Sequence, residues 1–261
     1  MKKFSQIQQR KILTIPVSAI SPNNAMDYIF HVVKHSRGYY VCLANVHMCM
    51  EAHDSPVFNK VVNNSVLVLP DGMPLVWLLR YLMKKKGVEQ IRGADFFMRL
   101  CKQAERKNVA IGLYGGRSDA LFALKNKIRS KFPYIRITFD SSPPFRELTI
   151  KEKEDYIKKI RESNCQILFV GLGCPKQEKW MAEYKSELSC VMVGVGAAFD
   201  FLSGRKKYAP HWIQRIGMEW LFRLVHDPCR LWKRYMKHNP RFVYYAGKQI
   251  IQHFFLQHRR K

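Results

Sequence analysis

Short apolar runs alternate with longer amphipathic stretches along the first 200 residues of the chain. From Asn108 onward the alternation is regular, with strand candidates at 109–114, 135–139, 166–171 and 190–196. Helix candidates lie between or beside them at 118–131, 149–163 and 176–188. The first hundred residues are less regular, with strand candidates at 12–17, 39–44 and 66–69 and helix candidates at 22–35, 47–62, 73–85 and 94–107. Apolar strands that alternate with helices are typical of βαβ units, so we predict an α/β fold in which these strands share one parallel sheet.

The character of the chain changes after Gly204. Residues 205–261 hold fourteen Lys or Arg side chains against two acidic ones, together with eleven aromatic residues. Apolar residues recur at helical spacing within 212–226, and Asp227-Pro228 should end that helix. Beyond this point aromatic and basic residues interleave, a pattern that suits the interface of an anionic membrane. We therefore predict a core over 1–204 and an appendage over 205–261, with 235–261 as its membrane anchor.

The net charge of +25 requires a polyanionic partner, and nucleic acid, anionic lipid and phosphorylated substrates all satisfy it. The seven cysteines are scattered and form no C-x-x-C pair, which indicates a reducing compartment. The N-terminus shows no export signal, and no apolar run approaches the ~20 residues that span a bilayer. We expect any membrane contact to be peripheral.

Two polar residues directly follow predicted strands. Asn45 comes after 39–44, and Asp71 stands in a Pro-Asp-Gly turn after the run that begins at residue 66. Ligands of open α/β sheets bind beyond the carboxyl ends of the strands, so both are candidate site residues. Each also has a structural interpretation, because Asn often caps helices and Pro-Asp-Gly is a common turn. We expect His47 and His53 to be packing or surface residues rather than ligands.

Glycine-rich turns follow three other strands. Glycine lets the backbone amides of a strand-to-helix turn approach a phosphate, although a tight turn alone would also explain it. In G-L-G-C-P-K-Q-E, three polar residues come next, at a helix N-terminus that we expect to face the ligand. The candidate binding residues from these turns are Gly115, Gly116, Gly171, Gly173, Lys176, Gln177, Glu178 and Gly196.

The joint order and spacing of several short motifs carry a more specific signal than any one of them. The motifs are A-N-V-H-M, L-P-D-G-M-P, R-G-A-D, L-Y-G-G, G-L-G-C-P-K-Q-E and G-V-G-A-A-F-D-F-L-S-G, followed by A-P-H-W, M-E-W-L-F-R-L and D-P-C-R-L-W-K-R-Y. In this order the chain resembles the WecG/TagA/CpsF family of bacterial glycosyltransferases from about Tyr39 to Arg241.

The resemblance implies a Rossmann-like α/β core and an inverting transfer of a sugar from a UDP-sugar to an undecaprenyl-diphosphate-linked sugar. Such an enzyme serves cell-surface polysaccharide synthesis, works peripherally at the cytoplasmic face of the cell membrane and needs no cofactor. No D-x-D motif is present to hold a divalent cation on the donor. We therefore expect no essential metal, with arginines and helix N-termini neutralising the UDP that leaves.

The resemblance also assigns roles to individual positions. Asp71 matches the proposed general base. The pocket positions are Asn45, Arg92 and Gln177, and the appendage arginines that would bind diphosphate are Arg223 and Arg230. The third basic position is either Lys233 or Arg234. Family members often carry Thr at the position of Leu43, so the resemblance does not identify the sugar that is transferred.

Two other functions fit parts of the sequence. Gly112, Gly115 and Gly116 follow a strand and Asp140 ends the next, as in an NAD-dependent oxidoreductase, but the spacing is not G-x-G-x-x-G. The basic, aromatic-rich appendage would also suit a nucleic-acid-binding protein. No recognisable RNA- or DNA-binding signature accompanies it, so we expect no nucleic-acid partner. A homo-oligomer is compatible with the sequence, which leaves the oligomeric state open.

Overall fold

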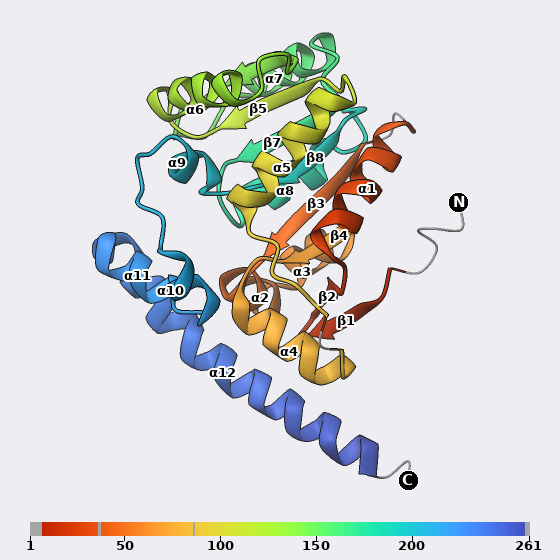
Figure 1. The fold of residues 1–261 in the computed structure, drawn as a ribbon, viewed down its shortest axis with the longest axis vertical. Coiled ribbons are helices and arrows are strands. Elements are labelled where there is room, and N and C mark those ends of the chain that lie inside the picture. The colour runs from red at the N-terminus through yellow and green to blue at the C-terminus, as the bar shows by residue number, and fades with distance from the viewer. Residues whose placement is uncertain (1–6, 36–37, 86, 259–261) are drawn as a thin grey trace.

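The computed structural model describes residues 7–35, 38–85 and 87–258. Its centre is a six-stranded sheet in which every neighbouring pair is parallel (Figure 1). The strands lie in the order β4-β3-β8-β7-β5-β6. Their bounds are β3 Tyr39–Ala44, β4 Leu67–Pro70, β5 Ile111–Gly115, β6 Ile137–Ser141, β7 Ile167–Gly171 and β8 Val191–Gly194. The predicted Rossmann-like α/β core is confirmed.

Helices cover both faces of the sheet, because successive side chains of each strand point to opposite sides. Cys42 of β3 packs with one buried apolar cluster and Leu43 with the other. The first cluster includes residues of α2 (Val46–Asp54), α3 (Pro56–Asn63), α4 (Met73–Met83), α7 (Ile150–Glu162) and α8 (Lys176–Tyr184). The second includes residues of α1 (Pro22–Val33), α5 (Gly93–Arg106), α6 (Ser118–Lys131) and α9 (Ala198–Leu202). A strand buried on both faces reads as a continuous apolar run, which is why these strands could be predicted.

Two predictions about the first hundred residues are wrong in detail. The run 12–17 does not join the sheet, because β1 (Gln9–Ile12) and β2 (Ile15–Ser18) form a separate antiparallel hairpin. Leu13, in its two-residue turn, has φ of +53°, a left-handed conformation that leucine rarely adopts. The single helix predicted over 47–62 is two helices, since Ser55 caps α3 through the amide of Phe58 and Pro56 begins it.

The C-terminal segment forms α10 (His211–Arg215), α11 (Glu219–His226) and α12 (Pro228–His258). Asp227-Pro228 separates α11 from α12, as predicted. In Figure 1, α12 is the long blue helix that passes beneath α2 and α4. It is not only a surface element, since Phe242 is buried in the core cluster with α2 and α4. Within the described ranges, no helix is long and apolar enough to cross a membrane.

Candidate active site

A cavity of about 600 Å³ lies beyond the carboxyl ends of β3, β4, β7 and β8. The loops that follow these strands line it, together with residues of the C-terminal segment between Arg205 and Arg234. Another cavity, of about 440 Å³, lies where β3 begins, and Lys185 is the one formally charged side chain among the described residues around it. The cavity at the carboxyl ends combines many polar groups from several elements, which makes it the candidate active site.

Most of the predicted site residues meet in this cavity. Those that line it are Asn45, Asp71, Arg92, Gly116, Gly171, Gly173, Gln177, Gly196, Arg223, Arg230 and Arg234. Those outside its lining are Gly115, Lys176 and Glu178. Of the two alternatives for the third basic position, Arg234 lines the cavity, whereas Lys233 lies over the ring of Trp232.

Asp71 stands directly after β4, and its own amide donates to the carbonyl of Ala44 at 2.8 Å. Its Oδ1 accepts the amide N–H of Gly93 at 3.1 Å, so the carboxylate is held at the start of α5. Burial, followed by the negative charge of Glu219, raises the pKa of Asp71 to about 7, and the Gly93 amide and Arg223 oppose that shift. A carboxylate with this pKa can accept a proton near neutral pH.

Asn45 caps a helix and also lines the cavity. Its Oδ1 accepts the amide N–H of Met48 at 3.2 Å, so the side chain caps α2. It also hydrogen-bonds the carboxylate of Asp71 and lines the cavity. The cap therefore fixes the orientation of an amide that stabilises the ionised form of Asp71.

Gln177 joins two of the glycine turns. Its Oε1 accepts the amide of Gly196 at 3.0 Å and that of Gly173 at 3.3 Å, and its Nε2 donates to Glu178 at 2.6 Å. The side chain is only 3% exposed, although it contributes to the cavity wall. Gln177 therefore holds the loops after β7 and β8 together, in addition to whatever contact it makes with a ligand.

Glu178 and Lys176 were expected to face the ligand, but both lie outside the cavity lining. Glu178 is fully buried beside Gln177, and burial raises the pKa of its carboxyl group to about 7. Lys176 is exposed and lies outside the cavity lining. Neighbouring positions of a helix point in different directions, so the N-terminus of α8 can direct only one of these three side chains to the cavity.

Gly115 has a structural role that differs from that of Gly173. Its φ is +114°, and a Cβ there would lie 2.7 Å from the backbone of Gly171, so the close approach of two strands requires glycine. Gly173 has φ of +80°, with nothing within 4 Å of where a Cβ would stand. The backbone at Gly173 is left-handed and open to the cavity. A ligand can therefore approach the backbone amides of the turn that contains Gly173.

Positive charge dominates the cavity. Its lining includes seven arginine or lysine side chains against three carboxylates. The cations are Arg92, Arg117, Arg205, Lys206, Arg223, Arg230 and Arg234, and the carboxylates are Asp71, Asp200 and Glu219. A concave surface with this excess of positive charge attracts an anionic ligand.

Several of these cations are held by neighbouring groups. Arg230 Nε donates to Asp227 at 2.7 Å, and Arg92 pairs with Asp95. The guanidinium of Arg223 lies 5.1 Å from the ring centre of Phe201 and 4.0 Å from Glu219. Such contacts orient the guanidinium groups before a ligand arrives, and planar guanidinium groups suit bidentate binding of phosphate.

Sequence reasoning missed several residues of the cavity. Glu219 influences Asp71 electrostatically, and Tyr208, Arg205 and Lys206 line the cavity from the segment that leads to α10. Glu219 lies within the M-E-W-L-F-R-L motif, so the resemblance contained its signal. The others lie in a connection with no regular pattern, and only the folded chain brings them to the site.

Of the residues behind the oxidoreductase alternative, Gly116 lines the cavity, whereas Gly112, Gly115 and Asp140 lie outside its lining. Gly112 is buried within β5, where a Cβ would lie 2.8 Å from Leu168. Asp140 is paired with Lys125 at 2.9 Å and lies outside the cavity lining. Gly112 therefore serves strand packing, and Asp140 has no position from which to bind a ribose in this cavity.

Comparison with known proteins agrees with the family resemblance that the motif order indicates. Residues 10–255 match the family described as glycosyl transferase WecG/TagA/CpsF. A Bacillus subtilis (strain 168) protein named N-acetylglucosaminyldiphosphoundecaprenol N-acetyl-beta-D-mannosaminyltransferase is 31% identical over 230 residues, covering 87% of each chain. A Bacillus spizizenii protein of the same name is 30% identical over 209 residues, covering 80% of this chain and 78% of its own. The chain therefore belongs to the WecG/TagA/CpsF family of glycosyltransferases.

Proposed function

We propose that this glycosyltransferase moves a sugar from a UDP-sugar to a polyprenyl-diphosphate-linked sugar, in one displacement that inverts the anomeric centre. The observation that carries the proposal is the pairing of one carboxylate whose pKa lies near 7 with a strongly cationic cavity wall. The first group suits removal of a proton, and the second suits a diphosphate. Both Bacillus relatives are named for a sugar linked to diphosphoundecaprenol, which supports a polyprenyl-diphosphate-linked sugar as the acceptor.

Asp71 is the general base of this reaction. Its carboxylate takes the proton from the acceptor hydroxyl as that oxygen forms a bond to the anomeric carbon of the donor. The bond from that carbon to the diphosphate oxygen breaks at the same time, and UDP leaves with its electron pair. The Gly93 amide and Asn45 hold the carboxylate for this transfer. General-base assistance of this kind is typically worth ~10²–10⁴ in rate.

Arginines of the C-terminal segment neutralise the diphosphate. Arg223, Arg230 and Arg234 reach the cavity from α11 and α12, whereas Asp71 reaches it from the end of β4. Their fixed positive charges take the role that a divalent cation has in other nucleotide-sugar enzymes, so we propose a metal-independent transfer.

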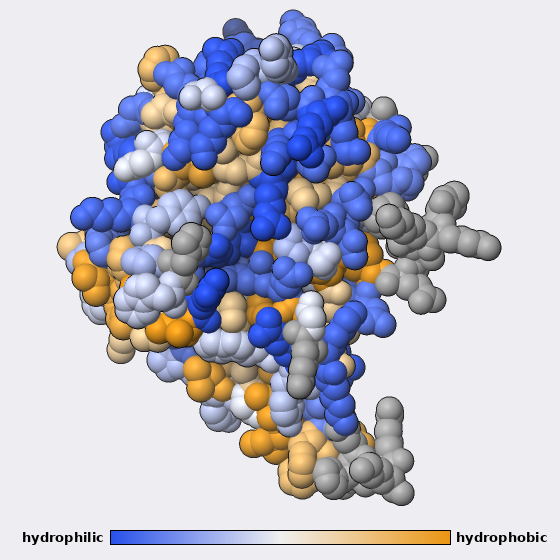
Figure 2. Space-filling view, viewed as in Figure 1, coloured by the Kyte–Doolittle hydropathy of each residue, from blue (hydrophilic) through white to orange (hydrophobic). Residues whose placement is uncertain are grey.

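A peripheral position on the cytoplasmic face of the cell membrane follows from the acceptor. Figure 2 shows apolar residues gathered where α10 and α11 lie and along the far end of α12. The exposed members on α10, α11 and the turn between them are Trp212, Ile216, Trp220, Leu221 and Val225. Exposed aromatic and aliphatic side chains beside basic ones suit the headgroup region, which would bring a lipid-linked substrate to the cavity.

A screen of UDP-sugars against a short-chain lipid-diphosphate-linked N-acetylglucosamine tests the proposal. We expect one or more UDP-sugars to give a product heavier by one sugar residue, with release of UDP, and no such product from the Asp71→Asn variant. Transfer only from a lipid-phosphate sugar, with no reaction of any UDP-sugar, would contradict the donor class.

A further inference from the structure

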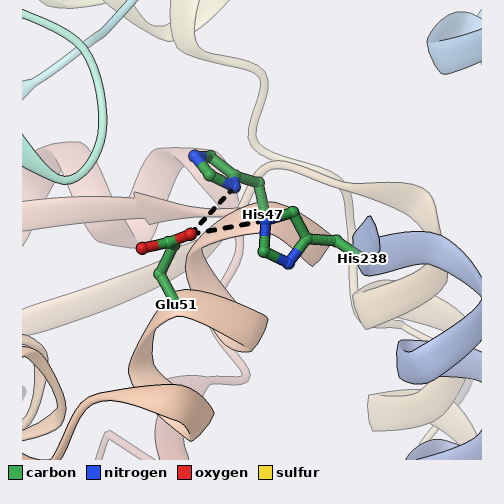
Figure 3. Close-up of side chains that lie close together, drawn as sticks. All are labelled: His47, Glu51 and His238. Carbon is green, nitrogen blue, oxygen red and sulfur yellow. Dashed lines mark ion pairs between the residues drawn. The ribbon is translucent and has the colours of Figure 1, made fainter. Parts of the chain in front are cut away.

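Three potential metal ligands converge where α2 meets α12. His47 and Glu51 lie one turn apart on α2, and His238 comes from α12 (Figure 3). Glu51 Oε1 is 3.3 Å from His238 Nε2 and 3.9 Å from His47 Nδ1. One ligand atom from each residue lies within 4.8 Å of the other two. His238 stands 187 residues after Glu51 in the sequence, so only the fold creates this cluster.

Two buried nitrogen atoms of this cluster have no hydrogen-bond partner among the described residues. The side chain of His238 is 4% exposed and that of His47 is 16% exposed. Within the described residues, the Nδ1 atoms of both histidines are buried without a hydrogen-bond partner. A buried polar atom without a partner is unfavourable, and a cation bound at Nδ1 of His47 would provide one there.

We propose that His47, Glu51 and His238 bind a divalent transition-metal ion of the zinc class. Two imidazoles and one carboxylate are an established zinc ligand set, and they leave a fourth position for water. Ligand bonds of ~2.0–2.2 Å place tetrahedral ligand atoms about 3.4 Å apart. The pair formed by Glu51 and His238 already has this separation, and rotation of the His47 side chain would bring the third ligand in.

The surroundings favour zinc over magnesium or calcium. Arg234 and Lys237 act on His47 with positive charge, which weakens the site for any cation. Magnesium and calcium bind mainly through carboxylate and carbonyl oxygens, whereas imidazole binds zinc and its neighbours strongly. Only a metal that prefers nitrogen ligands would overcome this repulsion.

The site would tie the C-terminal segment to the core. Two ligands belong to α2 and the third belongs to α12, which also carries Arg230 and Arg234. His47 lines the same cavity as these arginines. A bound ion would therefore fix the position of α12 relative to the strand ends. The three ligands would bind the ion whichever donor and acceptor the enzyme uses.

A cobalt and zinc titration of the full chain tests the site. Zinc also binds thiolates, and Cys229 is an exposed cysteine, so the titration uses a Cys229→Ser background that has been freed of metal with a chelator. We expect one equivalent of Co²⁺ to bind with visible d–d bands and without the intense near-ultraviolet absorption of cobalt-thiolate bonds. Zn²⁺ should displace it and raise the melting temperature.

Ligand variants decide which residues hold the metal. Glu51→Gln and His238→Ala should each weaken Zn²⁺ binding by at least about tenfold, since even second-shell changes have effects of this size. His53→Gln is the matched control, because His53 lies in the same contact between α2 and α12. The centre of its ring is 4.3 Å from the ring centre of Tyr245 on α12. It should bind Zn²⁺ as the parent does.

Three outcomes would overturn the site: no saturable one-equivalent binding, equal affinity in both ligand variants, or a cobalt-thiolate spectrum. Circular dichroism and melting in chelator show whether each variant folds. If His238→Ala does not fold, Glu51→Gln decides the question alone, because the partly exposed carboxylate of Glu51 can be neutralised with little change in shape.

Discussion

The two walls of the cavity differ in what they offer a substrate. The core wall consists of strand ends and their loops, with glycine backbones, the amides of Asn45 and Gln177, and the carboxylates of Asp71 and Asp200. It carries two of the seven cations, Arg92 and Arg117. The wall from the C-terminal segment offers mostly cations, together with Glu219. The carboxylate of Asp71 is held by the backbone amide of Gly93, whereas Arg223 and Arg230 are oriented by side-chain contacts.

The two walls therefore have different tasks in the reaction. The rigid sheet holds the group whose position must be accurate for proton transfer. The helices of the C-terminal segment supply charge, which acts over longer distances and tolerates looser placement. Substitutions in the two walls should therefore fail in different ways.

The largest effect is expected in the core wall. Asp71→Asn should lower turnover by ~10²–10⁴ while donor affinity stays near that of the wild type, because the amide cannot accept the proton but still accepts the Gly93 N–H. Turnover and donor titration, measured on one preparation, check this. Unchanged turnover in a folded variant would exclude Asp71 as the base.

The opposite wall should respond through binding. Arg223→Ala and Arg230→Ala should each lower kcat/KM by about tenfold to a hundredfold, the value of one charge-assisted hydrogen bond to an anion. Arg215→Ala is the control, since Arg215 is exposed and outside the cavity lining. The proposed diphosphate role fails if both arginine variants keep full activity.

The long helix α12 should separate membrane contact from stability. Replacing the exposed residues Tyr244, Ile251 and Phe255 with serine should reduce co-sedimentation with anionic vesicles by about tenfold or more, without a change in melting temperature. Phe242→Ala should instead destabilise the fold by about 3–5 kcal/mol, because its ring is buried in the core cluster. Unchanged sedimentation of the triple variant would remove the anchor from this part of α12.

The packing of Phe242 also changes the expected result of a truncation. The prediction of 235–261 as the membrane anchor implies that its deletion releases the protein from membranes and leaves a folded core. Because the deletion would remove Phe242 and His238, which are both buried, it would also expose part of the core. Point substitutions on the exposed face of α12 therefore test the anchor more cleanly.

Glu219, on the C-terminal wall, should influence how turnover depends on pH, because its charge raises the pKa of Asp71 on the core wall. The raised pKa of Asp71 means that turnover rises with pH through about 7, as the base ionises. Because Glu219 contributes to that rise, Glu219→Gln should move this limb to lower pH. A pH–rate profile of both proteins checks the shift, and an unmoved limb would mean that Glu219 does not influence the base.

The same pKa makes a prediction about stability. A carboxyl group whose pKa is higher in the folded than in the unfolded state stabilises the fold fully below about pH 4, and this contribution is lost as the pH rises through about 7. The melting temperature of Asp71→Asn, measured relative to that of the wild type, should therefore increase as the pH rises from about 4 to about 7. A constant difference across the range would show that Asp71 ionises normally.

The smallest effect is expected from chelation. If arginines alone neutralise the diphosphate, EDTA should leave the transfer rate within about twofold. EDTA would also remove the proposed zinc ion, which should lower the melting temperature slightly without a matching loss of rate. Activity that is abolished by EDTA and restored by magnesium or manganese would contradict the metal-independent transfer.

Sequence alone predicted the sheet because buried parallel strands form apolar runs with turn residues at their ends. It failed at 12–17, where a turn at Leu13 lies inside an apolar run and carries no glycine or proline to mark it. It also placed Glu178 at the ligand, since the rotation of α8 is set by packing that involves Met181. Arg205 and Lys206 escaped detection because only the return of the chain over the strand ends brings them there.

The anomeric configuration of the product shows whether Asp71 activates the acceptor for a single displacement. Proton NMR of the disaccharide formed from an α-linked UDP-sugar and a short-chain acceptor measures it. One displacement predicts a β-linked product. An α-linked product would require a second displacement or a front-face reaction, and would contradict the role given to Asp71.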